Sequence, residues 1–296
     1  MKKTLFEGVA TALVTPMRED GSVDYEALDR LVDWQIAEGV SALVACGTTG
    51  EASTLTDEEH REVIARVVKK ANKRVPVIAG TGSNDLDYAL SLTKYACEAG
   101  ADAVLTVTPY YNKATQAGLI KMFTALADHS TVPVILYNVP SRTGVNIEPA
   151  TYKALMEHEN IIAIKEANGN ISKIVETMSY VSENLDMYSG NDDQIVPIMS
   201  LGGKGVISVV SNILPRKTSL MCEKFLKGDI EGARQIQFDL HAVIDSLFSE
   251  VNPIPVKAAM AKMGYGTNTL RLPLTPMSEA KYEVMLKLMR EQGLDV

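Results

Sequence analysis

The sequence predicts an α/β protein, a (β/α)8 TIM barrel with a C-terminal helical extension. Short apolar runs alternate with longer amphipathic segments, and this alternation repeats eight times along the chain. The main alternative, an open doubly wound sheet, is disfavoured because the first apolar run leads into Thr15-Pro16-Met17-Arg18 instead of a Gly-x-Gly-x-x-Gly turn. A length of 296 residues is ordinary for a single barrel.

The expected strands are short runs that are apolar on both faces, as parallel strands are when helices cover the sheet. In chain order they are residues 9–14, 42–45, 76–79, 103–107, 133–137, 161–164, 187–189 and 205–209. Segments 57–72, 84–99 and 117–128 carry apolar residues on one face, which indicates helices. Thr56 and Glu59 are placed to form a capping box at the start of the first of these.

The pattern changes from about Gly228. Segments 230–250, 253–263 and 278–292 all have helical periodicity, with no strand between them. We therefore expect the barrel to comprise residues 1–227 and a helical extension, residues 228–296, to pack on it.

The overall composition disfavours several functional classes. A net charge of −8 without a large Lys/Arg cluster is not typical of a nucleic-acid-binding protein. The three cysteines are distant from one another, so neither a disulfide framework nor a zinc site is expected. No run approaches the roughly 18 apolar residues of a membrane span. We expect a cytoplasmic protein that binds neither nucleic acid nor membrane.

In a barrel the active site lies at the C-terminal ends of the strands. The polar segments at these ends are residues 45–51, 108–112, 136–144, 164–166 and 189–192. Lys165 stands out because it follows the apolar run Ile161-Ile162-Ala163-Ile164. Burial disfavours its ammonium form, and a free amine is a nucleophile that forms Schiff bases with ketones. An ion pair with a carboxylate such as Glu166 is an equally good interpretation of its position.

Other residues at the strand ends also leave two interpretations open. Tyr137 can pass protons beside a Schiff base, or it can simply pack in the core. The Gly47-Thr48-Thr49-Gly50 loop can hold a carboxylate on its N–H groups, or it can be a plain turn. Arg142 can grip a carboxylate in a bidentate fork, or it can form a surface ion pair.

Several motifs in this order resemble one known family. They are Gly47-Thr48-Thr49-Gly50-Glu51, Tyr110-Tyr111-Asn112-Lys113, Tyr137-Asn138-Val139-Pro140-Ser141-Arg142-Thr143-Gly144, Lys165-Glu166-Ala167 and Asn252-Pro253-Ile254-Pro255-Val256-Lys257. Together they resemble the pyruvate-dependent class I aldolases, the family of dihydrodipicolinate synthase and N-acetylneuraminate lyase. The likeness runs nearly end to end.

The resemblance implies a catalytic role for four residues. Lys165 would form an imine with pyruvate, and Tyr137 would assist proton transfer. Thr48 would connect Tyr137 to Tyr111, which in this family is lent by a neighbouring subunit. The protein would therefore be at least a dimer, with a tetramer of two tight dimers as the family expectation. No metal or organic cofactor is implied, because the protonated imine is itself the electron sink.

The resemblance also implies which residues bind substrate. Thr49 would hold the pyruvate carboxylate, with the backbone near Gly190 and Ile207 completing the pocket. Arg142 would bind the carboxylate of aspartate semialdehyde, which favours the synthase branch of the family. The expected product is 4-hydroxy-tetrahydrodipicolinate, on the route to diaminopimelate and lysine.

Two alternatives remain. One is a sister lyase that uses the same imine with another aldehyde, such as a sugar acid. The other is a barrel that has lost catalysis, which is disfavoured because Lys165, Tyr137 and Thr48 are all present.

Regulation is expected to differ from that of family members inhibited by L-lysine. This sequence has Asp57 and Tyr88 where those members have a histidine and a glutamate. Without that glutamate, the ligand's ammonium loses a charge-assisted hydrogen bond. Feedback inhibition by lysine is therefore predicted to be weak or absent.

Overall fold

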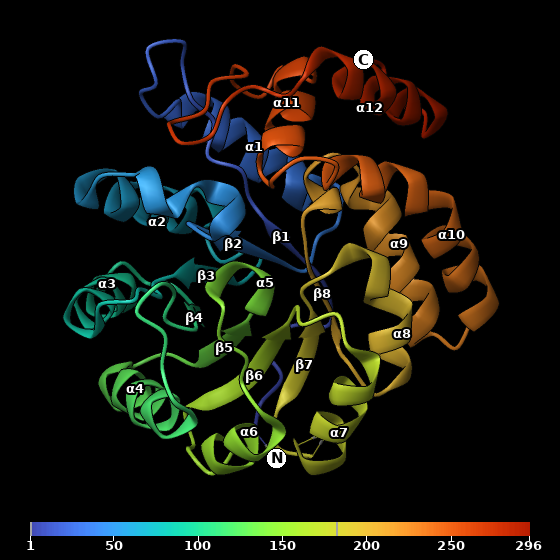
Figure 1. Ribbon diagram of the computed structural model, residues 1–296. Coiled ribbons are helices and arrows are strands. Elements are labelled where there is room, and N and C mark those ends of the chain that lie inside the picture. Colours follow the sequence, from blue (N-terminus) through green and yellow to red (C-terminus); the bar gives the residue numbers. More distant parts are fainter. Residues whose placement is uncertain (1, 182) are drawn as a thin grey trace.

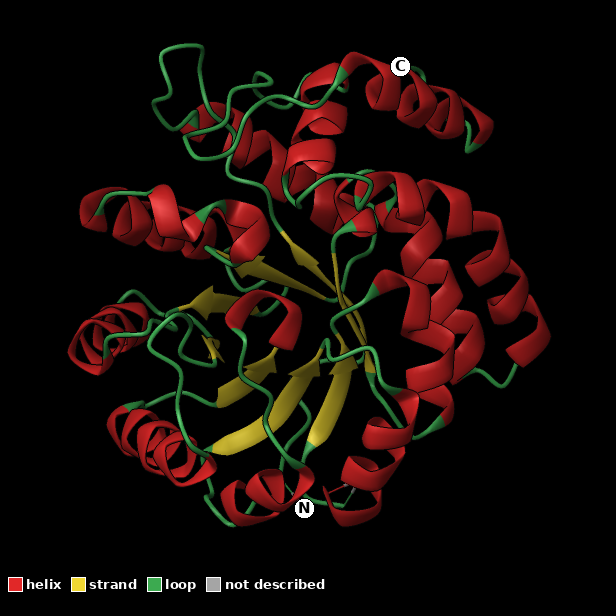
Figure 2. Ribbon diagram, viewed as in Figure 1, coloured by secondary structure: helices red, strands yellow, loops and turns green. Residues whose placement is uncertain are grey.

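The computed structural model describes residues 2–181 and 183–296, and it confirms the predicted barrel. Eight parallel strands close into a ring in chain order, and helices surround them (Figures 1 and 2). The strands are β1 Gly8–Ala12, β2 Ala42–Ala45, β3 Val77–Gly80, β4 Ala103–Val107, β5 Val134–Asn138, β6 Ile161–Glu166, β7 Asp186–Ser189 and β8 Gly205–Ser208.

The helices follow the strands and then continue beyond the barrel. They are α1 Tyr25–Ala37, α2 Asp57–Ala71, α3 Leu86–Glu98, α4 Gln116–His129, α5 Pro140–Thr143, α6 Pro149–Leu155, α7 Ile171–Val181, α8 Ile195–Ser200, α9 Pro215–Leu226, α10 Ile230–Leu247, α11 Ile254–Lys262 and α12 Glu279–Glu291. Short 3₁₀ turns are η1 Thr48–Gly50, η2 Ala52–Thr54, η3 Asp192–Gln194 and η4 Val210–Asn212. The predicted capping box of α2 is present, with Glu59 N and Thr56 Oγ1 3.2 Å apart.

Two strand ends differ from the prediction by two residues, for identifiable reasons, and the other strand bounds differ by one residue at most. β1 ends at Ala12, two residues early, and the backbone N–H of Val14 donates to the Asn212 side chain instead of a neighbouring strand. β6 continues two residues beyond the apolar run, to Glu166. Lys165 pairs with Tyr137 on one side and Tyr188 on the other, so backbone pairing carries the strand past the point where hydrophobicity ends.

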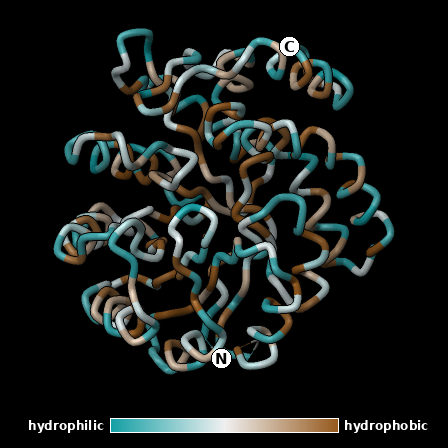
Figure 3. Tube along the Cα trace, viewed as in Figure 1, coloured by the Kyte–Doolittle hydropathy of each residue, from teal (hydrophilic) through white to brown (hydrophobic). Residues whose placement is uncertain are grey.

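The core has two layers, as expected for a barrel with helices outside. The inner layer fills the barrel with side chains that include Ala10, Val44, Ile135, Tyr137 and Ile207. The outer layer lies between strands and helices, and the hydrophobic colouring of Figure 3 concentrates in the strands and the helix faces that cover them. Side chains alternate between the two layers along each strand, which fixes the residues that face the interior.

The C-terminal helices pack on one side of the barrel. α10 lies against α8 and α9, and α12 lies against α10 and α11 (Figure 1). α11 follows the cis peptide bond between Asn252 and Pro253. Asn252 lies at the C-terminal end of the barrel, where it contacts residues from the loops after β2 and β5.

Candidate active site

Lys165 and Tyr137 lie side by side inside the barrel. They are paired in register on β6 and β5, and Lys165 Nζ lies 4.1 Å from the centroid of the Tyr137 ring. Both side chains are buried, with 6% and 7% of their surfaces exposed. The structure therefore brings together the two residues that the sequence placed at neighbouring strand ends.

Glu166 is not the partner of Lys165, which removes the interpretation of Lys165 as half of an ion pair with it. Successive residues of a strand point to opposite faces, so Glu166 points outward, away from the interior. Its carboxylate accepts hydrogen bonds from Asn138, Tyr152 and the backbone of Asn168. Burial raises the pKa of Glu166 to about 7.

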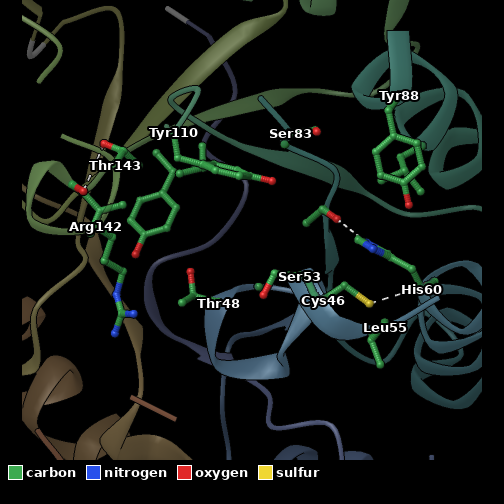
Figure 4. A pocket seen from close by; sticks show the side chains of 18 residues that line it. Cys46, Thr48, Ser53, Leu55, His60, Ser83, Tyr88, Tyr110, Arg142 and Thr143 are labelled. Atoms are coloured by element: carbon green, nitrogen blue, oxygen red, sulfur yellow. Dashed lines mark hydrogen bonds between the residues drawn. The ribbon is translucent and has the colours of Figure 1, made fainter. Parts of the chain in front are cut away.

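A cavity of about 400 Å³ opens over the C-terminal ends of β2 to β5. Thr48, Tyr137 and Arg142 line one part of it, and His60 and Tyr88 line another. Figure 4 shows Thr48 and Arg142 toward one end, with His60 and Tyr88 at the other. Three of the residues predicted from the sequence thus share one cavity, next to the buried Lys165.

The loop that carries Thr48 and Thr49 is held by the C-terminal segment. Asn252 Nδ2 donates to Thr49 Oγ1 at 3.1 Å, and the Asn252 carbonyl accepts from Arg142 at 3.1 Å. At the end of the same loop, buried Glu51 forms an ion pair with buried Lys257. Asn252 thereby links the two predicted carboxylate-binding residues.

Gly190 and Ile207 lie at the ends of β7 and β8. The Gly190 N–H donates to the Glu166 carbonyl at 2.7 Å, and a Cβ at this position would lie 2.7 Å from that of Ala167, so the close approach favours glycine. Ile207 is fully buried in the interior layer with Tyr137. Both residues are therefore at the barrel end that holds Lys165.

Asp192 is a buried acid at the same end. Its Oδ2 accepts from the backbone N–H groups of Val209 and Val210, at 3.0 and 2.8 Å. Burial raises the pKa of Asp192, and the hydrogen bonds that its carboxylate accepts from the Ser208 side chain and from backbone N–H groups partly oppose this effect. Neither Asp192 nor Asn252 was singled out from the sequence. Both lay within quoted segments, but their contacts depend on tertiary packing that no local pattern encodes.

Tyr111 is the predicted site residue that the single chain leaves almost entirely exposed, away from the cavity. Its side chain is 92% exposed, and its backbone has a φ of 70°. The neighbouring Tyr110 lines the cavity instead. A large aromatic side chain held outward in this way is free to contact a second molecule.

The part of the cavity lined by His60 and Tyr88 belongs to the region expected to determine sensitivity to L-lysine. Asp57 accepts a hydrogen bond from Arg61 at 2.7 Å, which lowers the pKa of Asp57. His60 Nε2 lies 2.8 Å from the Gly80 carbonyl, and burial lowers the pKa of His60. Among the described residues, none of those lining the cavity is a carboxylate.

Within residues 2–181 and 183–296, no cluster of three or more His, Cys, Asp or Glu side chains could hold a metal ion. In the same described ranges, no helix combines the length and the apolar character needed to cross a bilayer.

Comparison with known proteins extends the geometric findings. Residues 5–292 match the Dihydrodipicolinate synthetase family. The chain belongs to this family. It is 53% identical over 294 residues to the 4-hydroxy-tetrahydrodipicolinate synthase of Acetivibrio thermocellus, covering 99% of this chain and 100% of that protein.

Solved structures of the family superpose closely on this fold. A chloride-inhibited dihydrodipicolinate synthase from Acinetobacter baumannii, in complex with pyruvate, is 43% identical with a TM-score of 0.95, covering 98% and 99% of the two chains. The lysine-bound enzyme of Cyanidioschyzon merolae is 37% identical with a TM-score of 0.95 and the same coverage.

Proposed function

We propose that this protein is a class I aldolase of the lyase type, a 4-hydroxy-tetrahydrodipicolinate synthase. It condenses pyruvate with L-aspartate 4-semialdehyde through a Schiff base on Lys165. The observation that carries the proposal is the buried amine of Lys165 lying 4.1 Å from the centroid of the Tyr137 ring. Membership of the Dihydrodipicolinate synthetase family supports the choice of reaction.

The proposed chemistry begins with attack of the Lys165 amine on the ketone carbon of pyruvate, which gives a carbinolamine. Its hydroxyl takes up a proton, proposed to come from Tyr137, and leaves as water, so that a protonated imine forms. Loss of a proton from the adjacent methyl group gives an enamine, whose carbon attacks the aldehyde to form the new carbon–carbon bond. The amino group of the added semialdehyde then attacks the imine carbon, which closes the ring and releases the Lys165 amine. Tyr137 is proposed to accept and return these protons, with Thr48 linking it to Tyr111. The imine supplies the electron sink, so the proposal includes no cofactor.

Binding of pyruvate is assigned to the loop after β2 and the ends of β7 and β8. Thr49 is proposed to hold the pyruvate carboxylate, because it is buried in a 3₁₀ turn with backbone N–H groups nearby. Gly190 and Ile207 are proposed to complete the pocket. The close approach at Gly190 supports this, since a side chain there would collide with Ala167.

Arg142 is proposed to select the aldehyde by binding its carboxylate. It lies in the cavity beside Thr48, and the Asn252 carbonyl orients its guanidinium through one nitrogen. The remaining N–H groups can form a bidentate pair with a carboxylate. A sugar acceptor without a carboxylate at this position would gain nothing from the arginine.

Steady-state assays with both aldehydes test the proposal. The unmutated protein should turn over pyruvate with aspartate semialdehyde and not with N-acetylmannosamine. Arg142→Ala should raise the KM for the semialdehyde about 10- to 100-fold while the KM for pyruvate stays within about threefold, as expected for loss of a charged hydrogen-bonding pair. Arg142→Lys is the matched control, which keeps the charge but loses the fork. Failure of the unmutated protein to use aspartate semialdehyde would overturn the synthase assignment.

The protein is proposed to act as a homo-oligomer, at least a dimer and, as the finer proposal, a tetramer of two dimers. The outward position of Tyr111, with 92% of its side chain exposed, supports a role in a neighbouring subunit's site. A cytoplasmic location is also proposed, and the three free cysteines fit a reducing compartment.

We also propose a division into a barrel, residues 1–227, and a helical extension, residues 228–296. Helices α10, α11 and α12 follow the last strand without further strands among the described residues, which supports this boundary. The extension is proposed to contribute to the site through Asn252, because its amide and carbonyl contact Thr49 and Arg142.

A further inference from the structure

The strand ends that carry Tyr137 and Lys165 are joined on the outer side of the barrel. Asn138 and Glu166 are the next residues on β5 and β6, and they are paired in register with each other. Strand alternation points them away from the interior, toward the covering helices. Asn138 Nδ2 donates to Glu166 Oε1 at 2.9 Å, so a side-chain bond lies directly behind the Tyr137–Lys165 pair.

Glu166 also connects this bond to other elements. Its Oε1 accepts from the Asn168 N–H, and its Oε2 accepts from the Tyr152 hydroxyl of α6, both at 2.9 Å. Its carbonyl oxygen accepts from the Gly190 N–H at the end of β7, at 2.7 Å. One residue therefore joins the ends of three neighbouring strands, which carry Tyr137, Lys165 and Gly190.

Asn138 is equally constrained. Its Nδ2 also donates to Asn146 Oδ1 at 2.8 Å, and its Oδ1 accepts from the Ile147 N–H at 3.1 Å. Asn138 and Glu166 are both fully buried. Moving either side chain would leave buried polar groups without partners, which is costly, so the bond holds the two strand ends in one arrangement.

We propose that Glu166 is a positioning residue for the reaction. Through Asn138 it fixes the relative position of β5 and β6, and so sets the Lys165 amine against the Tyr137 side chain. This inference rests on the proposed function, in which a proton must pass between substrate on Lys165 and the Tyr137 hydroxyl. Proton transfer and attack need groups within a narrow range of separation, so a small displacement of the strand ends slows the chemistry.

The hydrogen bonds of the Glu166 carboxylate define what a replacement side chain at this position must provide. Among the described residues, the three hydrogen-bond partners of the Glu166 carboxylate are all neutral groups. A glutamine can satisfy them, with its oxygen accepting from Asn138 and Asn168 and its nitrogen donating to the Tyr152 oxygen. An alanine can satisfy none. A positioning role therefore predicts rescue by glutamine, and a role for the charge does not.

The experiment compares Glu166→Ala, Glu166→Gln, Asn138→Ala and the double alanine variant. Glu166→Ala should lower kcat about 10- to 100-fold with the pyruvate KM within about threefold, the scale expected for misplaced reacting groups. Glu166→Gln should stay within about threefold of the unmutated kcat. The double variant should be no slower than the slower single variant, because the two residues act as one unit.

Tyr152→Phe is the matched control. It removes a hydrogen bond to Glu166 that comes from α6 and not from a strand end. It should lower the thermal unfolding temperature while kcat at 25 °C stays within about threefold. If Glu166 had only a structural role, Glu166→Ala would likewise lower the unfolding temperature and leave kcat nearly unchanged.

Two results would decide against the inference. Glu166→Gln as slow as Glu166→Ala would assign the role to charge. Alanine variants with lowered unfolding temperature but normal kcat would leave Glu166 purely structural. If Glu166→Ala does not fold, Asn138→Ala and Glu166→Gln make the same comparison. Trapping of the pyruvate imine on the unmutated protein separates the two proposals. Absence of the imine overturns the proposed function. A normal imine together with unchanged kcat in the variants overturns the positioning role alone.

Discussion

Lys165 Nζ lies 4.1 Å from the centroid of the Tyr137 ring, and the two residues are partners in the register of β5 and β6. Pairing of the two neighbouring strands thus places an amine and a phenol in one buried site. The following predictions depend on this pair and on the groups that surround it.

Tyr137→Phe should keep the ring beside Lys165 and remove the proton-transfer group. We expect kcat to fall about 10²- to 10⁴-fold, the range for loss of a general acid–base, with a much smaller change in the KM for pyruvate. Steady-state kinetics measure both parameters. The control is Tyr152→Phe, which removes a hydroxyl outside the cavity. A Tyr137→Phe enzyme with kcat within threefold of normal, roughly, would assign proton transfer to another group.

Mixing two inactive variants should restore activity if Tyr111 acts in a neighbouring subunit. A subunit with Tyr111→Phe retains Lys165, and a Lys165→Ala partner can lend it an intact Tyr111. Random reassociation in dimers should restore about a quarter of the normal sites. The measurement is activity after co-refolding or subunit exchange, against each variant treated alone. Mixtures no more active than the separate variants would place Tyr111 outside the neighbouring site.

L-lysine should inhibit this enzyme weakly or not at all. Among the described residues, those lining the cavity include Tyr88 but no carboxylate, and Asp57 is already bonded to Arg61. An ammonium entering the cavity would lose its hydration without gaining a charged partner. Initial rates with rising L-lysine measure this, and half-inhibition below about 1 mM would contradict it. The variant carrying Asp57→His and Tyr88→Glu should become more sensitive.

Glu166 should make the stability of the protein depend on pH in a defined window. Burial raises the pKa of Glu166 from 4.5 to about 7. The folded state therefore binds more protons than the unfolded state between these values, and stability falls as pH rises through the window. Tyr152 from α6 is the titratable group in direct contact, and Glu148 lies two hydrogen bonds further away, through Asn138 and Asn146.

Glu166→Gln removes this titration while keeping the hydrogen bonds. Between pH 4 and 8, roughly, the unmutated protein should lose of the order of 3 kcal/mol more stability than the glutamine variant, because each pKa unit corresponds to about 1.4 kcal/mol. Thermal or denaturant unfolding across this range provides the comparison. Parallel stability curves for the two proteins would show that Glu166 keeps an ordinary pKa.

The sequence was sufficient to predict the barrel and much of the arrangement at its C-terminal end. Apolar runs located the strands, and the barrel rule then turned their ends into candidates such as Lys165 and Tyr137. Hydrophobicity could not predict that β6 continues through Lys165 to Glu166, because backbone pairing, not side-chain character, extends the strand there. Because β6 includes both residues, the Glu166 side chain must point to the face of the sheet opposite to that of Lys165.

Other features depended on contacts between distant segments. Asn252 lies more than 100 residues from Arg142 and about 200 from Thr49, yet it bonds to both. No local pattern encodes such a contact, although the segment was recognisable as a family motif. The exposure of Tyr111 was likewise beyond local analysis, since it depends on which surfaces the folded chain leaves free.

The central claim is that Lys165 forms an imine with pyruvate. Incubation with pyruvate and sodium borohydride, followed by peptide mass spectrometry, tests it most directly. The account predicts a stable adduct of reduced pyruvate on the peptide containing Lys165 and no adduct on buried Lys257, which is paired with Glu51. Lys165→Ala should give no adduct. Absence of the adduct from the unmutated protein, or its appearance on another lysine instead, would contradict the account.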